Sequence, residues 1–135
     1  MMNASFGWRC SFRSELGTVP KVVVQDGMLT VLLGTFEALK AGRDSVGVEL
    51  WRVKFVVVDE GERRNKLGTQ EEGRASHIGA FVRRGEKSFV FWPKKTPAVV
   101  IQVVDPMWSE IIIGDEKAKE IASQLRLEIA RAKAE

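Results

Sequence analysis

The chain has 135 residues, of which 44% are hydrophobic and 29% are charged, and 21 basic against 18 acidic side chains give a net charge of +3. This composition is typical of a soluble globular protein and is too mildly basic to indicate nucleic-acid binding. It contains no apolar run of the ~18 residues that a membrane-spanning helix needs, and no secretory leader is recognisable. We therefore expect a single domain over residues 1–135 in the cytoplasm, where the lone Cys10 would stay reduced.

The first predicted elements are a strand and a hairpin. Residues 6–12 alternate Phe, Trp, Cys and Phe with Gly, Arg and Ser, which is the period of a half-buried strand. Asp26-Gly27 separates two apolar runs, residues 21–25 and 28–33. Because Asp-Gly suits a two-residue turn, this is the strongest hairpin signal in the sequence.

The next segments predict one ambiguous connection and one interrupted strand. Residues 34–42 fit either a short helix or the end of the preceding strand. Residues 46–58 are rich in β-branched and aromatic side chains, but their alternation breaks near Trp51-Arg52. The break predicts a bulge or a bend between two pieces of strand.

A polar segment, residues 59–76, divides the chain. Leu67 is its one large apolar side chain, so the segment is expected to contribute nothing to the core. A loop of this length is either functional or disordered.

The second half of the chain is the most regular. Strands are predicted over residues 78–84, 88–92, 98–104 and 107–113. Period-2 alternation places Phe89 and Phe91 on one face of the second of these strands and Val90 and Trp92 on the other. The third is almost wholly apolar, with Gln102 as the polar exception, and so predicts burial on both faces.

The chain is expected to end in an amphipathic helix over residues 115–133. Asp115 is placed to cap its N-terminus, where a carboxylate accepts hydrogen bonds from backbone N–H groups. Apolar residues then recur at helical spacing and form one narrow stripe. The stripe consists of Ala118, Ile121, Ala122, Leu125 and Ile129.

About seven short antiparallel strands and one helix predict a mainly β protein, a barrel or sandwich capped by the helix. Residues 73–92, with Gly79-Ala80-Phe81 in a Gly-x-Phe position, resemble bacterial pleckstrin-homology domains, as do the later strands and the acidic start of the helix. The resemblance implies a barrel closed by the C-terminal helix. It does not extend to phosphoinositide binding, because the Gln25-Asp26-Gly27 turn lacks the basic residues that many members carry in their first hairpin. If the strand over residues 6–12 is the first one instead, the loop after it offers only Lys21.

The sequence offers little for catalysis. His77 is the only histidine, and Ser76 beside it is a weak nucleophile signal, so a strand-edge histidine is favoured over a small hydrolase built around His77. One cysteine and one histidine far apart in sequence predict no metal site, and no nucleotide-binding glycine motif is present. We expect no cofactor, no metal and no enzymatic activity.

The leading hypothesis is a non-enzymatic domain that binds a protein or peptide through loops or an exposed strand edge. The alternative is peripheral association with anionic membrane lipid through a basic surface, and self-assembly through strand edges is left open. Both binding hypotheses draw on basic side chains in and after the polar segment. The candidate binding surface consists of Arg63, Arg64, Lys66, Arg74, Arg83, Arg84, Lys87, Lys94 and Lys95.

Overall fold

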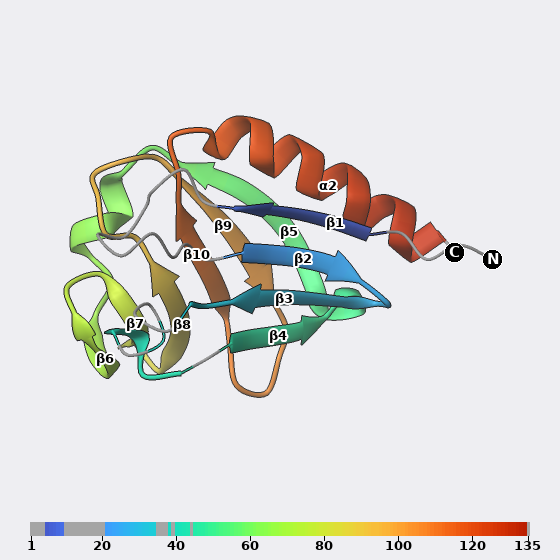
Figure 1. The fold of residues 1–135 in the computed structure, drawn as a ribbon. Coiled ribbons are helices and arrows are strands. Elements are labelled where there is room, and N and C mark those ends of the chain that lie inside the picture. The colour runs from blue at the N-terminus through green and yellow to red at the C-terminus, as the bar shows by residue number, and fades with distance from the viewer. Residues whose placement is uncertain (1–4, 10–20, 35–37, 39, 44, 135) are drawn as a thin grey trace.

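Two β-sheets pack face to face and one long helix lies along their upper end (Figure 1). The structure is a computed structural model that describes residues 5–9, 21–34, 38, 40–43 and 45–134. Cys10 and the end of the predicted strand 6–12 lie outside the described residues. Within the part of the chain that is described, the protein is mainly β with one C-terminal α-helix, as the sequence predicts.

The first sheet has four antiparallel strands in the order β1-β2-β3-β4. The strands are β1 (Ser5–Arg9), β2 (Lys21–Gln25), β3 (Met28–Leu32) and β4 (Ser45–Glu49). The predicted hairpin joins β2 to β3, with Gln25 paired to Met28. Asp26 and Gly27 in its turn both have positive φ, at 54° and 75°, which matches the twist of the two strands.

The second sheet has six strands in the order β5-β9-β10-β8-β7-β6. They are β5 (Val53–Asp59), β6 (Thr69–Ala75), β7 (Ile78–Arg83), β8 (Glu86–Phe91), β9 (Ala98–Val103) and β10 (Glu110–Gly114). The short 3-10 helix η1 (Leu50–Arg52) carries the chain from the first sheet to the second. This confirms the predicted break near Trp51-Arg52, which is a change of sheet.

The main core lies between the two sheets and under the helix. It joins Val22, Val24 and Leu29 of the first sheet to Phe89 and Phe91 of β8. A smaller apolar cluster covers the opposite face of the six-stranded sheet, and it contains Phe81, Val90, Trp92, Ala98, Val100 and Ile112, with Leu67 packed against it. The predicted alternation is confirmed, since Phe89 and Phe91 of β8 are buried on one face of the sheet, and Val90 and the following Trp92 are buried on the other.

The C-terminal helix α2 (Ala118–Ala134) begins a few residues after its predicted start. Oδ1 of Asp115 accepts a hydrogen bond from the backbone N–H of Lys117 at 2.8 Å, as expected for a cap. Four residues of the predicted stripe are buried, while Ile121 is half-buried. Glu128 is also buried, which the stripe did not predict.

Three expectations need correction. The closed barrel of about seven antiparallel strands is not confirmed, because the ten described strands form two separate sheets and β8 runs parallel to β10. The polar segment 59–76 is not a simple loop, since it forms the 3-10 helix η2 (Glu62–Asn65) and the edge strand β6. The strand expected over 107–113 is β10, which begins only at Glu110.

The polar segment is ordered because a few side chains anchor it. Leu67 packs on the smaller cluster, although the segment was expected to contribute nothing to a core. Arg64 donates hydrogen bonds to the backbone oxygens of Trp92 and Pro93 at 3.0 and 2.9 Å. Asp59 Oδ1 accepts from the N–H groups of Gly61 and Arg63 at 2.8 and 3.3 Å, which sets the first turn of η2. These few contacts give a polar segment a defined path over the sheet.

A second anchor ties the connection between β3 and β4 to the edge strand β6. Residues 38, 40 and 41 are helical, which supports the helical alternative for residues 34–42. Arg43 Nη2 lies 2.6 Å from Oε1 of Glu72, and its guanidinium also lies over the Trp108 ring at 4.8 Å from the ring centre. The hydrogen bond from Arg43 is the main cause that lowers the pKa of the Glu72 carboxyl.

We expect the Arg43–Glu72 ion pair to make the free energy of unfolding depend on pH in the acidic range. The pKa of the Glu72 carboxyl is lower in the folded chain than in the unfolded chain, so the ionised carboxylate stabilises the fold. This stabilisation is complete above the unfolded pKa of about 4.3 and is lost as the pH falls through the lower, folded pKa. Glu72→Gln should therefore flatten the fall in unfolding free energy below pH 5, measured by urea denaturation. Glu120→Gln, which removes an exposed helix carboxylate, is the control and should keep the wild-type slope. Equal slopes in all three proteins would contradict the expectation.

Candidate basic binding pocket

A row of polar side chains crosses the otherwise apolar second face of the six-stranded sheet. Glu110 of β10 is the register partner of Ser88 on β8 and of Gln102 on β9. The three residues therefore lie side by side at one level of the sheet. Their neighbours on the same face, Val90, Val100 and Ile112, belong to the smaller apolar cluster.

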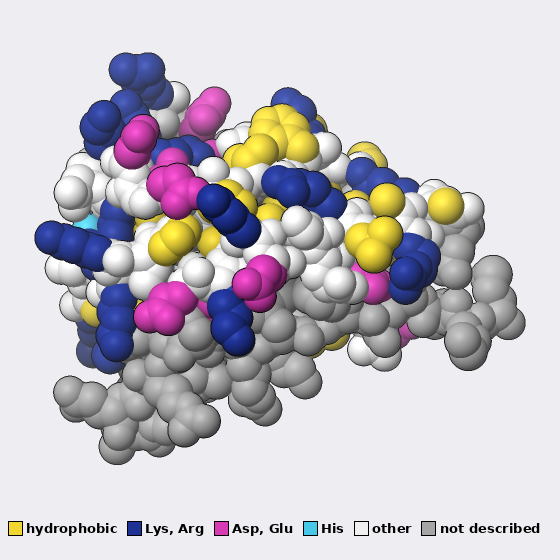
Figure 2. Space-filling model, turned by 90° about the horizontal axis from the view of Figure 1, so that it is seen from above, with side chains coloured by type: hydrophobic (Ala, Val, Ile, Leu, Met, Phe, Trp, Pro, Cys, Tyr) yellow, Lys and Arg dark blue, Asp and Glu magenta, His cyan; other side chains and the backbone are white. Residues whose placement is uncertain are grey.

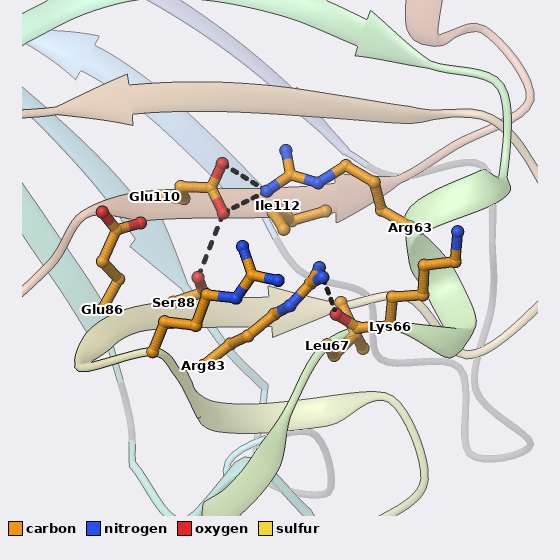
Figure 3. Close-up of a pocket in the computed structure, with 9 residues that line it drawn as sticks. Arg63, Lys66, Leu67, Arg83, Glu86, Ser88, Glu110 and Ile112 are labelled. Atoms are coloured by element: carbon orange, nitrogen blue, oxygen red, sulfur yellow. Dashed lines mark hydrogen bonds and ion pairs between the residues drawn. The ribbon is translucent and has the colours of Figure 1, made fainter.

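Glu110 is the centre of this row and is only 6% exposed. Arg63 on η2 reaches across and places Nη2 at 2.5 and 2.6 Å from the two carboxylate oxygens (Figure 3). Ser88 Oγ donates to Oε1 at 3.2 Å, and the side-chain amide of Gln102 donates to Oε2. A buried carboxylate is costly unless it is paired and hydrogen-bonded, and here three side chains supply donors.

A pocket of about 280 Å³ opens beside this row. Its walls come from the segment after η2, from the turn between β7 and β8, and from the middle strands of the sheet. Figure 3 shows the guanidinium of Arg83 directed into the space between Glu110 and Leu67. The lining residues are Arg63, Lys66, Leu67, Arg83, Arg84, Glu86, Ser88, Glu110 and Ile112.

The pocket carries an excess of positive charge. Four cations against two carboxylates leave two uncompensated positive charges. Arg63 forms an ion pair with Glu110, and Nη1 of Arg83 donates a hydrogen bond to the backbone oxygen of Lys66 at 3.2 Å. Within the described residues, the ammonium of Lys66 and the guanidinium of Arg84 have no hydrogen-bond or ion-pair partner. The arrangement is suited to an anionic group, because several donors meet in one concave site.

The structure gathers four of the nine predicted surface residues at this pocket: Arg63, Lys66, Arg83 and Arg84. Two others have different surroundings. Arg64 anchors backbone oxygens, and burial lowers the pKa of its guanidinium. Lys87 lies 3.6 Å from Glu72 and 5.4 Å from the centre of the Trp108 ring. The last three, Arg74, Lys94 and Lys95, are exposed and do not line the pocket.

His77 lies in a neighbouring open hollow of about 300 Å³, which shares Leu67 with the basic pocket. It occupies a turn with φ 63°, and its backbone oxygen accepts a hydrogen bond from Trp92 N at 2.9 Å. Burial, and secondly the charge of Arg64, lower the pKa of its imidazole. Ser76 lines the same hollow, but no hydrogen bond joins the two side chains in the described structure.

Sequence reasoning missed Glu86, Ser88, Gln102 and Glu110. The usable signal was strand parity, because Glu110 shares its face with Ile112 and Gln102 shares its face with Val100. A carboxylate at the start of an apolar strand predicts a buried ion pair. Only the order of the strands, however, shows that Ser88 and Gln102 flank it.

The chain matches no family model, no curated protein and no solved structure. Over the described residues, no three His, Cys, Asp or Glu side chains lie close enough to hold a metal ion. No helix in that same part of the chain has the length and apolar character needed to cross a membrane. On the side that carries α2, basic and acidic side chains are interspersed and hydrophobic side chains form small separate patches (Figure 2).

Proposed function

We propose that this protein is a non-enzymatic binding module that holds an acidic segment of a protein or peptide in the basic pocket. The observation that carries the proposal is the meeting of Lys66, Arg83 and Arg84 at one concave site beside a carboxylate that Arg63 already neutralises. Recognition of acidic motifs by clustered arginines is a recurring mode of peptide binding. Both Glu110 oxygens accept side-chain hydrogen bonds, which supports a structural role for this carboxylate over acid–base chemistry.

Both edges of the six-stranded sheet are poorly suited to pairing with a partner's strand, which favours binding through loops. At the β5 edge, Arg126 Nε donates to Val56 O and Lys133 Nζ donates to Val53 O, each at 2.7 Å. These side chains of α2 occupy carbonyl groups that a partner strand would need. At the other edge, the pairing of β6 with β7 is interrupted by two register shifts. Bulged and covered edges are typical devices against strand addition.

Fluorescence anisotropy with a labelled octaglutamate peptide tests the proposal. We expect binding at low salt that weakens as salt rises, and at least a tenfold loss of affinity in the Lys66→Ala/Arg84→Ala double variant. Neither side chain has a partner among the described residues, so the fold should be unaffected. Arg74→Ala/Lys95→Ala removes the same charge outside the pocket and should bind like wild type. No binding at low salt, or equal losses in the two double variants, would overturn the proposal.

The alternative function, association with an anionic membrane, rests on Lys87, Lys94 and Lys95, whose arrangement supports it less well than the pocket supports peptide binding. Lys87 lies near the start of β8, while Lys94 and Lys95 follow its end. At about 3.3 Å per residue, roughly 13 Å of strand separates Lys87 from the end of β8 at Phe91, and Lys94 and Lys95 lie in the loop beyond, so the three lysines do not form one compact patch. Sedimentation with phosphatidylserine vesicles tests this alternative, and retention that depends on Lys94 and Lys95 would favour it.

The remaining expectations stay predictions. A cytoplasmic location is a proposal, self-assembly through a strand edge stays open, and a small hydrolase around His77 is the least favoured alternative. A pleckstrin-homology relationship is also a proposal, and the packing of α2 against β5 and β9 supports it. The absence of phosphoinositide binding remains expected, because the β2–β3 turn carries Asp26 and Gly27.

A further inference from the structure

We infer that the preferred ligand of the basic pocket is a phosphorylated side chain of a peptide, that is, a phosphomonoester dianion. The inference rests on the proposed function and names the chemical class of its ligand. It is carried by the number of uncompensated cations, by their placement on two facing segments, and by the size of the pocket.

The charge balance distinguishes a dianion from a carboxylate. Arg63 and Glu110 neutralise each other, which leaves Lys66, Arg83 and Arg84 against the single carboxylate of Glu86. One carboxylate from a ligand would still leave an excess positive charge. A phosphomonoester carries about −1.5 to −2 at pH 7 and has three acceptor oxygens, so it matches both the excess charge and the number of cations.

The cations approach from two sides. Lys66 belongs to the segment that follows η2, whereas Arg83 is the last residue of β7 and Arg84 lies in the turn that joins β7 to β8. The bond from Arg83 Nη1 to the Lys66 backbone oxygen spans the gap and holds the two segments together (Figure 3). That bond uses one N–H of the guanidinium, and an arginine has five, so others are available for phosphate oxygens.

The dimensions favour one side chain over a whole small molecule. The volume of about 280 Å³ falls at or below the lower end of the ~300–1,000 Å³ range typical of small-molecule sites. Leu67 and Ile112 give the floor an apolar part, against which the carbon atoms of a phosphorylated residue can pack. The groups facing the pocket are Arg63, Lys66, Arg83, Arg84, Glu86 and Glu110, and His77 lies in the adjoining hollow.

The test compares N-acetyl-phosphoserine-N-methylamide with N-acetyl-glutamate-N-methylamide by ¹H–¹⁵N NMR titration of the full chain. We expect the phosphoserine probe to bind at least tenfold more tightly and to shift the amides of residues 66–68 and 83–86. Its affinity should rise severalfold between pH 5.5 and pH 7.5, because the second phosphate pKa is about 6. The carboxyl of the glutamate probe has a pKa of about 4.3 and is therefore almost fully ionised throughout this pH range, so its affinity should stay constant. His77→Asn, which suits the positive φ at that position, should leave the rise unchanged.

The outcomes separate this inference from the proposed function. Equal affinities for the two probes, or no rise with pH, would overturn the inference and leave acidic-peptide binding intact, provided octaglutamate binds. If inorganic phosphate binds as tightly as the phosphoserine probe, the pocket recognises phosphate alone, which would overturn the inference that its ligand is a phosphorylated peptide. If vesicles containing phosphatidate bind more tightly than the phosphoserine probe, and this binding depends on Lys66 and Arg84, the phosphate belongs to a lipid, and the inference is overturned as well. Loss of phosphoserine binding in Lys66→Ala/Arg84→Ala, but not in Arg74→Ala/Lys95→Ala, would support it.

Discussion

Replacing Gly79 with alanine is expected to lower the free energy of unfolding by more than about 3 kcal/mol. Gly79 has φ 132°, and a Cβ atom on it would lie 1.9 Å from the backbone oxygen of Glu72. The obstacle is backbone, so no side-chain rotation can relieve it. Since Glu72 belongs to β6 and Gly79 to β7, we expect the edge strand to lose its pairing. Urea denaturation measures the cost, and amide hydrogen exchange shows whether β6 is the part released.

Gly85→Ala is the matched control for that substitution. Gly85 also has a positive φ, 80°, but a Cβ there would meet nothing within 4 Å. Its replacement should therefore cost only the backbone term of about 1–2 kcal/mol. The difference between the two variants isolates the close approach of β6 to β7. Similar costs in both would show that backbone conformation alone explains the effect at Gly79.

Removal of Arg63 is the second large effect that we expect. Among the described residues, Arg63→Ala leaves the buried Glu110 carboxylate with Ser88 and Gln102 as its only side-chain donors. Breaking a buried ion pair costs about 3–5 kcal/mol, and the 37% exposure of the Arg63 side chain should reduce this to about 2–3 kcal/mol. The loss should be visible as a lower urea midpoint with an unchanged slope.

A double variant tests the physical cause. Arg63→Ala/Glu110→Gln removes the charge together with its partner, so it should be more stable than Arg63→Ala alone. The two single variants and the double variant form a cycle that measures the coupling directly. If the double variant is no more stable than Arg63→Ala, the charge of Glu110 is satisfied without Arg63, and the pair does not secure η2 to the sheet.

Strand alternation predicted the two buried faces of β8 but not the pocket beside them. The parity of residues 88–92 correctly separated Phe89 and Phe91 from Val90 and Trp92. In contrast, the polar segment 59–76 has too few apolar side chains for any periodic signal, and its path depends on single contacts made by Arg64 and Leu67. The contacts that build the pocket join residues 17 to 47 positions apart and leave no trace in local sequence, so the pocket could not be predicted.

The sequence by itself determined which faces of β8 and β9 are buried, where the β2–β3 hairpin turns and, to within a few residues, where the last helix begins. Those features follow from local periodicity, turn chemistry and capping, which act over a few residues. Only the tertiary structure decided that β8 and β10 pair in parallel and that the sheets stay separate. Strand order also brought Arg63 onto Glu110 and placed Lys66 opposite the β7–β8 turn. Strand pairing is set by packing of the whole core, and the candidate site is a consequence of that packing.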